Sequence, residues 1–223
     1  MDTCNRQLFF MVCLFVSSAS SEACWSADPI IPQQQVDDRV HDFELPIVGS
    51  KDYLRLSDQY RQGAVVVVVL RGYPGYQCPI CMRHVATLAN RAATLNRFAT
   101  KVILIYPGDS ESLEQHAEKF AGKRRLPEPM VIVRDDQMDT VRKWGLRWDA
   151  RNETAYPASY VIDRNGRIRW KQVSTSHAGR STVEEIEAGS KELPPQQASQ
   201  YRALVARGNY LAQDRSDIRY AVK

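Results

Sequence analysis

The sequence lacks a large excess of charge of either sign, because its 30 Lys and Arg residues are nearly balanced by 26 Asp and Glu residues. The net charge of +4 is too small and too diffuse to indicate a nucleic-acid-binding surface, so we expect no nucleic-acid partner. Cysteine is also scarce, with five in 223 residues, and Cys4 and Cys13 lie close to the start. The three cysteines that remain are too few for a disulfide scaffold.

The first apolar run is short. It extends from Leu8 to Val16 after Arg6, and about nine residues cannot cross a bilayer as an ordinary helix. The small residues of segment 17–23 follow it, as in a secretory signal peptide. We therefore expect residues 1–23 to be a signal peptide and the protein to be exported, to the periplasm or the extracellular space. A retained leader or a lipidated Cys24 would instead anchor it to a membrane.

The rest of the chain has the composition of an ordinary globular domain, with 43% hydrophobic and 25% charged residues. We expect one domain at 41–192, because the predicted strands and helices fall there. Residues 24–40 are expected to be a polar linker, and residues 193–223 a short helix and a tail. No internal repeat is found in the sequence.

Several segments have the pattern of strands. Residues 64–70 contain five consecutive valines, which predicts a strand buried on both faces. Asn165-Gly166 lies between two strand-like runs and predicts a β-hairpin. Short edge strands are expected at 43–46 and 54–56, and other strands at 102–106, 130–133, 160–162 and 167–173.

Helical patterns alternate with these strands. One amphipathic helix is predicted by apolar residues at spacings of three and four, namely Val85, Leu88, Ala92, Leu95 and Ala99. A second helix carries Leu113, Ala117 and Phe120 and ends at Gly122, and a short one is expected at 138–144. Ser181-Thr-Val-Glu184 has the spacing of a capping box. This order predicts an α/β, thioredoxin-like fold, with helices flanking a central mixed sheet and a closing hairpin.

The most reactive feature is Cys78-Pro-Ile-Cys81, which follows the valine-rich strand and opens the first long helix. The positive end of a helix and its unpaired N–H groups stabilise a thiolate, and a Cys-x-x-Cys pair there can close a disulfide across one turn. In an exported protein, we expect that disulfide to be the resting state. The pattern therefore predicts thiol redox chemistry.

Residues from about 41 to 190 resemble the peroxiredoxin-like members of the alkyl hydroperoxide reductase and thiol-specific antioxidant group, the redoxins. The residues that carry the resemblance are Asp42-Phe-Glu-Leu45 with Leu56-Ser-Asp58, the segment 71–81, Pro157-Ala-Ser-Tyr-Val-Ile-Asp163 with Asn165-Gly166, and His177-Ala-Gly-Arg180. The resemblance implies a thioredoxin-like fold, a hydroperoxide or protein-disulfide substrate and a thioredoxin-like electron donor. We expect no cofactor and no metal.

The resemblance leaves the roles of the two thiols open. In peroxiredoxins the attacking cysteine ends a Pro-x-x-x-Thr-x-x-Cys motif, which places Pro74 and Cys81 in the motif and Cys78 at the threonine position as the resolving thiol. In thioredoxin-like oxidoreductases Cys78 would be the exposed nucleophile and Cys81 the resolving thiol. Our first hypothesis is hydroperoxide reduction through Cys81. The alternatives are protein thiol–disulfide exchange through Cys78 and a non-catalytic thioredoxin-like binding module.

The arginine that peroxiredoxins use beside the thiolate is missing, because Pro157 occupies its usual place. Arg71 and Arg180 are the candidates to replace it, since a nearby guanidinium lowers the pKa of a thiol. Pro157 also lies where thioredoxin-like proteins have a cis-proline, and we expect the Tyr156–Pro157 peptide bond to be cis. The predicted catalytic residues are therefore Cys78, Cys81, Pro157 and Arg71.

Other readings of the same segment are weaker. Cys78, Cys81 and His84 make an incomplete zinc ligand set, and Met82 stands where covalent haem attachment requires histidine. We expect His84 to be a packing or surface residue of the helix. Three aromatic residues either line the thiol pocket or belong to the core, namely Tyr73, Tyr76 and Trp144.

Overall fold

The computed structural model describes residues 33–109, 111–122 and 126–191. The predicted signal peptide, Cys4, Cys13, Cys24 and the predicted C-terminal helix lie outside the described residues. Within the described part of the chain, no helix has the length and apolar character needed to cross a membrane.

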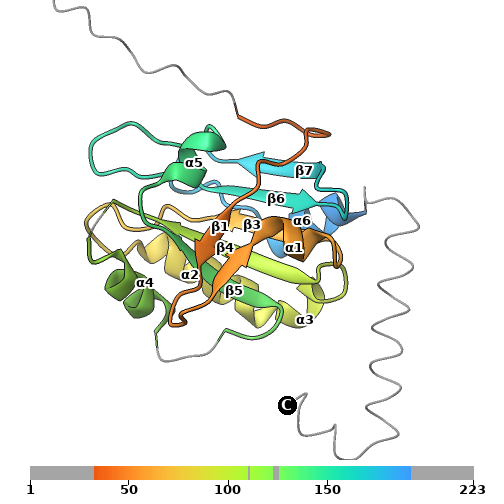
Figure 1. The fold of residues 1–223 in the computed structure, drawn as a ribbon, viewed down its shortest axis with the longest axis horizontal. Helices are drawn as coiled ribbons and strands as arrows, with labels where there is room; N and C mark the ends of the chain where they lie inside the picture. The colour runs from red at the N-terminus through yellow and green to blue at the C-terminus, as the bar shows by residue number, and fades with distance from the viewer. Residues whose placement is uncertain (1–32, 110, 123–125, 192–223) are drawn as a thin grey trace, which may run out of the picture.

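A mixed sheet of five strands, in the order β5-β4-β3-β6-β7, forms the centre of the domain (Figure 1). The strands are β3 (Val65–Val69), β4 (Lys101–Pro107), β5 (Met130–Asp135), β6 (Ala158–Ile162) and β7 (Ile168–Val173). The first three run parallel, and β6 and β7 are antiparallel to their neighbours. Because β3 is the middle strand, all five valines are at most 1% exposed. The predicted buried strand and the closing hairpin are confirmed.

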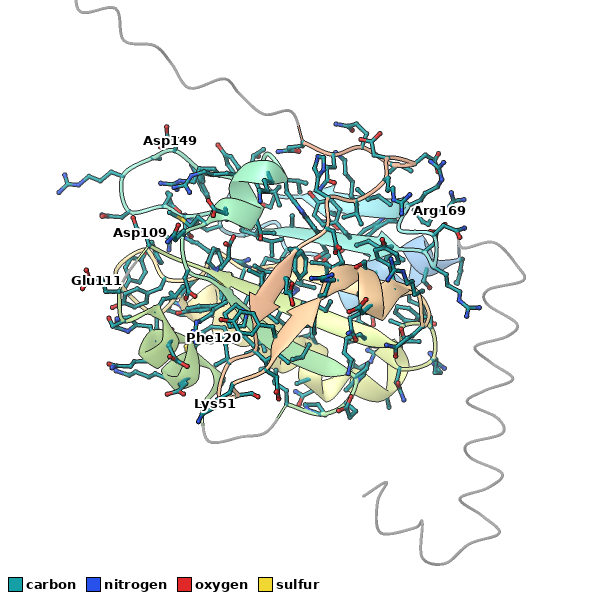
Figure 2. The ribbon with its side chains drawn as sticks, viewed as in Figure 1. Lys51, Asp109, Glu111, Phe120, Asp149 and Arg169 are labelled. Atoms are coloured by element: carbon teal, nitrogen blue, oxygen red, sulfur yellow. The ribbon has the colours of Figure 1, made fainter. Side chains whose placement is uncertain are left out.

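Helices and a small hairpin cover the two faces of this sheet (Figure 1). One face packs against α2 (Pro79–Asn90), α3 (Ala92–Leu95), α4 (Leu113–Ala121) and α6 (Val183–Ser190). The other packs against the paired strands β1 (Glu44–Pro46) and β2 (Tyr53–Arg55), and against α1 (Leu56–Tyr60) and α5 (Asp139–Lys143). Charged side chains such as Lys51, Asp109 and Asp149 extend outward from this body (Figure 2).

The domain begins earlier than predicted. Asp37 N donates to Ile168 O at 2.7 Å and Val40 N donates to Gly166 O at 2.8 Å, which attaches this segment to the β6–β7 hairpin. Val40 is only 5% exposed. The linker prediction is therefore wrong for residues 34–40, which pack on the domain.

Two helix predictions also need correction. The single helix expected from Val85 to Ala99 is divided at Arg91, whose φ of −113° and ψ of 19° separate α2 from α3. The capping box lies one residue later than its predicted place, because Thr182 and Glu185 exchange the two hydrogen bonds at the start of α6. The apolar faces were located correctly, whereas the helix ends depended on local geometry.

Candidate active site

The loop that leaves β3 is fixed before it reaches the cysteines. Gly72 has a φ of 69°, and a Cβ added there would overlap the carbonyl oxygen of Pro107 at the end of β4. Tyr73 N donates a hydrogen bond to the same carbonyl, at 2.9 Å. Only glycine fits this close approach without strain. Gly72 therefore lets the loop pack against the end of β4 before it continues to α2.

Cys78 is the N-cap of α2, and Pro79 occupies the first turn. Sγ of Cys78 accepts a hydrogen bond from the backbone N–H of Cys81 at 3.4 Å. Proline suits this position because its φ is already helical and it has no N–H to leave unpaired. The thiol therefore stands where a negative charge is stabilised by free N–H groups and by the helix dipole.

Both sulfurs lie inside the protein. Cys78 is 3% exposed and Cys81 is 0% exposed, and both are free thiols that join the core beneath α2. The expectation of an exposed nucleophile is therefore wrong, because the side chains pack against the sheet beside the helix they start. Of the two, only Cys78 keeps contact with solvent. The predicted resting disulfide stays a prediction.

The two thiols differ in ionisation. A hydrogen bond from the Cys81 thiol lowers the pKa of Cys78 to about 5; burial opposes this shift, while backbone N–H groups and the charge of Arg180 favour it. The pKa of Cys81 is raised, because its proton is held in the hydrogen bond to Cys78 and because burial disfavours the thiolate. The two shifts together favour the thiolate at Cys78 and the protonated thiol at Cys81. This is the reverse of the order that the peroxiredoxin motif predicts.

Arg180 is the cation that acts on these sulfurs. Its Nη2 lies 4.0 Å from Sγ of Cys78. Its Nε and Nη1 atoms are buried without a hydrogen-bond partner, and no carboxylate within the described residues forms an ion pair with it. The charge of Arg180 is therefore not compensated by an acid and is available to the thiolate.

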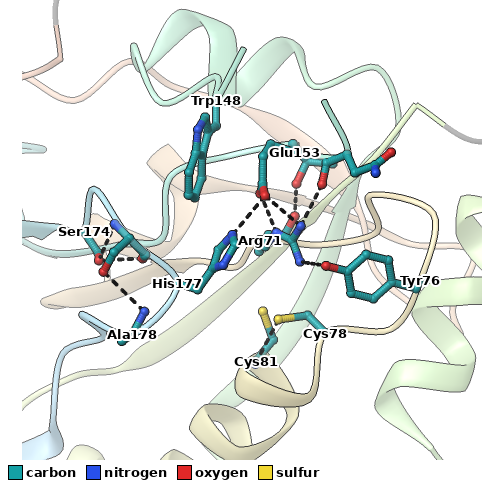
Figure 3. A network of polar contacts seen from close by, with 12 residues as sticks. Arg71, Tyr76, Cys78, Cys81, Trp148, Glu153, Ser174, His177 and Ala178 are labelled. Carbon is teal, nitrogen blue, oxygen red and sulfur yellow. Dashed lines mark hydrogen bonds and ion pairs between the residues drawn. The ribbon is translucent and has the colours of Figure 1, made fainter. Parts of the chain in front are cut away.

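Arg71, a predicted catalytic residue, lies close to the cysteines but bonds elsewhere (Figure 3). Its Nε and Nη2 contact the two carboxylate oxygens of Glu153 at 2.5 and 2.9 Å, and its Nη1 donates to the Tyr76 hydroxyl at 2.6 Å. Burial would lower the pKa of Arg71, but the bonds with Glu153 and Tyr76 raise it. The described hydrogen bonds of this guanidinium go to oxygen atoms, and Glu153 neutralises its charge.

The same ion pair connects three loops around the thiols (Figure 3). Arg71 Nη2 also donates to the carbonyl of Asn152 at 2.7 Å, and the Thr154 hydroxyl donates to the carbonyl of Arg71. Nε2 of His177 lies 2.9 Å from Oε1 of Glu153. The Arg71–Glu153 pair therefore connects the loop before α2, the segment before β6 and, through Glu153, the loop after β7.

Pro157 lies next to the end of β3, from which the thiol loop leaves, and its peptide geometry differs from the prediction. The pairing of Val69 with Ala158 places Pro157 next to the end of β3, and it lines a crevice with His84 and Arg180. The Tyr156–Pro157 peptide bond is trans, and the cis bond among the described residues is Glu128–Pro129. The cis prediction is therefore wrong: the chain runs extended into β6, and Pro157 O accepts from Ser174 N at 2.8 Å.

The aromatic candidates divide between the two faces. Trp144 is 1% exposed and packs with Phe43 and Tyr160 on the face opposite the thiols, so it is a core residue. Tyr76 is 48% exposed and contacts Arg71. Tyr73 stacks on His116 with ring centroids 3.6 Å apart.

Among the residues that the structure describes, no three His, Cys, Asp or Glu side chains gather as metal ligands would.

A mixed sheet with two thiols at the start of the helix after its central strand defines a thiol-dependent redox enzyme of the thioredoxin fold. The AhpC/TSA family model matches residues 36–171, more than half of the chain, and the chain belongs to this family. It is a peroxiredoxin-like thiol peroxidase or oxidoreductase rather than a non-catalytic module. A comparison with curated proteins gives no match.

Solved structures of peroxiredoxins share the fold. A reduced Prx3 from Vibrio vulnificus in complex with H2O2 has a TM-score of 0.58 at 15% identity, covering 71% of this chain and 99% of that one. Peroxidoxin BcpB from Mycobacterium tuberculosis has a TM-score of 0.55 at 20% identity, covering 73% and 99%. A peroxiredoxin-like protein from Aquifex aeolicus has a TM-score of 0.57 at 15% identity, covering 74% and 91%.

Proposed function

We propose that the protein is an exported thiol peroxidase in which Cys78 reduces hydroperoxides and Cys81 resolves the oxidised product. The observation that carries the proposal is the opposite ionisation of the pair, since the pKa of Cys78 is lowered and that of Cys81 is raised. The thiolate is the nucleophilic form of cysteine, so Cys78 is the sulfur prepared to attack. The complex of Vibrio vulnificus Prx3 with H2O2 supports a peroxide as the substrate class.

The reaction follows from these positions. The Cys78 thiolate attacks the terminal oxygen of the hydroperoxide, an S–O bond forms, the O–O bond breaks, and the alkoxide leaves and takes up a proton to become an alcohol. The Cys81 thiol then attacks the sulfur of the Cys78 sulfenic acid. An S–S bond forms, and the departing hydroxide takes the proton of the Cys81 thiol to become water.

The disulfide must then be reduced by a second dithiol. We propose a thioredoxin-like protein as this electron donor, because thiol–disulfide exchange through a mixed disulfide returns both cysteines to thiols. A related yeast mitochondrial peroxiredoxin is described as resolved by glutathione and thioredoxin systems, which supports a donor of this class.

Single-turnover peroxide consumption by cysteine variants tests the order of the thiols. Cys81→Ser is expected to consume about one equivalent of peroxide per chain, because Cys78 still attacks, and to stop at the sulfenic acid, which a dimedone adduct on Cys78 would report. Cys78→Ser is expected to consume no peroxide on the time scale of that reaction. The reverse pattern would assign the attack to Cys81 and overturn the proposal.

The second candidate is protein thiol–disulfide exchange, and the same ionisation order favours it. A nucleophilic first cysteine and a buried second cysteine also suit an enzyme that forms mixed disulfides with proteins. The two functions separate on substrates: rapid reduction of insulin disulfides by the wild-type chain without peroxide consumption would establish the exchange enzyme.

Export is the second part of the proposal, and it rests on the apolar segment from Leu8 to Val16 and the small residues after it. Expression of the full chain with a C-terminal tag, followed by cell fractionation and N-terminal sequencing, tests it. We expect an extracytoplasmic form that begins near Cys24. An intact chain in the cytoplasmic fraction would contradict export, and a membrane-bound chain that keeps residues 1–23 or carries lipid on Cys24 would show anchoring.

A further inference from the structure

His84 makes an unusual connection between α2 and the loop that carries Arg180. Its Nε2 lies 2.9 Å from the carbonyl oxygen of Ser181. A carbonyl only accepts, so Nε2 must carry the hydrogen and donate it. Burial lowers the pKa of His84 to about 4, so the ring is neutral at ordinary pH and Nδ1 bears no hydrogen. This agrees with Nδ1 being buried without a hydrogen-bond partner.

The guanidinium of Arg180 lacks the bonds that usually fix an arginine. Its Nε and Nη1 have no partner, and its Nη2 contacts only Sγ of Cys78, at 4.0 Å, among the hydrogen bonds of the described residues. Its position must therefore come from the backbone that carries it. Next to it in the chain, Ser181 is tied by two contacts, the His84 bond to its carbonyl and the Ser159 hydroxyl 2.5 Å from its own.

We propose that His84 is a positioning residue that, by donating to the carbonyl of Ser181, holds the Arg180 guanidinium beside Sγ of Cys78. Cys78 caps the same helix that bears His84. The bond from His84 therefore fixes the loop relative to the helix on which the nucleophile lies. Arg71 cannot replace Arg180 as the cation beside Cys78, because Glu153 neutralises the charge of Arg71.

His84 therefore influences formation of the Cys78 thiolate, although it contacts neither sulfur in any described contact. An opposite charge close to a thiol favours its ionised form, and moving the charge away removes that effect. Loss of the His84 bond should therefore raise the pKa of Cys78. The inference deepens the proposed function by adding a residue that sets the nucleophile, and it holds for peroxide reduction and for disulfide exchange alike.

The test is the rate of Cys78 alkylation by iodoacetamide as a function of pH, read by mass spectrometry on the reduced full chain. His84→Phe keeps a ring of similar size but has no donor, and it should move the midpoint of the pH–rate profile up by about one unit from the Cys78 pKa of about 5. At pH 6 this lowers the rate about twofold, because Cys78 is then only half ionised. His84→Gln restores an N–H near the Nε2 position and should recover most of the rate. His41→Phe is the matched control, because His41 is exposed and bonds through its backbone.

A double-mutant cycle decides whether His84 acts through Arg180. Arg180→Ala should raise the pKa of Cys78, and adding His84→Phe should raise it no further. Equal effects of His84→Phe with and without Arg180, or no effect at all, would overturn the inference. If His84→Phe does not fold, His84→Asn, whose amide is too short to reach Ser181, takes its place. Alkylation needs no peroxide turnover, so this result is independent of whether the peroxidase assignment holds.

Discussion

The two arginines nearest the thiols differ in how their charge is balanced. Arg71 is 4% exposed at its side chain and shares two contacts with Glu153, whereas Arg180 has no described acidic partner and lies 4.0 Å from Cys78. A compensated charge has little effect beyond its partner, while an uncompensated one close to a thiol typically lowers its pKa by ~1–3 units. Arg71 therefore stabilises the structure of the site, and Arg180 favours the ionised form of the thiol.

The Arg71–Glu153 pair should matter for stability. Glu153→Gln keeps the shape of the side chain but leaves the Arg71 charge buried without a counter-charge, and removal of one partner of a buried ion pair costs about 3–5 kcal/mol. We expect a loss of that size in the free energy of unfolding, measured with urea. A parallel loss of order in the loop before α2 would follow, because Arg71 also binds Tyr76.

The matched control for this prediction is Glu184→Gln. Glu184 forms an ion pair with Arg91 at 2.8 Å, but the two side chains are 63% and 47% exposed. Exposed pairs are worth under about 1 kcal/mol, so this variant should unfold almost as the wild type does. Equal losses for the two variants would mean that burial of the Arg71 pair contributes nothing.

Among the elements, the sequence located the strands and apolar helix faces well because both are repeated patterns. Five consecutive valines predict a buried strand without any knowledge of the strands it pairs with. Spacings of three and four residues place Leu88 and Leu95 on the core side of their helices. Helix ends are set by single residues, so the break at Arg91 and the cap at Thr182 were missed.

The site was predicted in part for a related reason. Cys78 and Cys81 form a local motif that the sequence shows directly, and the sheet register places Pro157 next to the end of β3. The sequence named Arg71 and Arg180 as candidate cations but could not distinguish them, because their contacts lie far along the chain: Arg180 is 102 residues from Cys78, and Glu153 is 82 residues from Arg71. His84 carried no signal of its own. Its importance comes from contact with a loop that sequence patterns cannot place.

In the whole molecule, the sheet separates two hydrophobic clusters. One contains Cys78, Cys81 and Leu88, and the other contains Leu56 and Trp144 on the opposite face. Alternate valines of β3 point into each cluster, so the two cores share one strand and should unfold together. The thiols nevertheless belong to only one of them, which links the packing of that core to the chemistry.

This division predicts different effects for two matched core variants. Leu88 in α2 and Leu56 in α1 are both 0% exposed, and replacing either with alanine should cost about 2–5 kcal/mol, in a single unfolding transition. Only Leu88→Ala opens space beneath the helix that begins at Cys78, so it alone should slow Cys78 alkylation at pH 6, under conditions where both variants remain folded. Equal alkylation rates would show that the thiol site is held by its loops and by Arg180 without support from the core. An effect of Leu56→Ala as large as that of Leu88→Ala would show that the sheet does not insulate the two cores from each other.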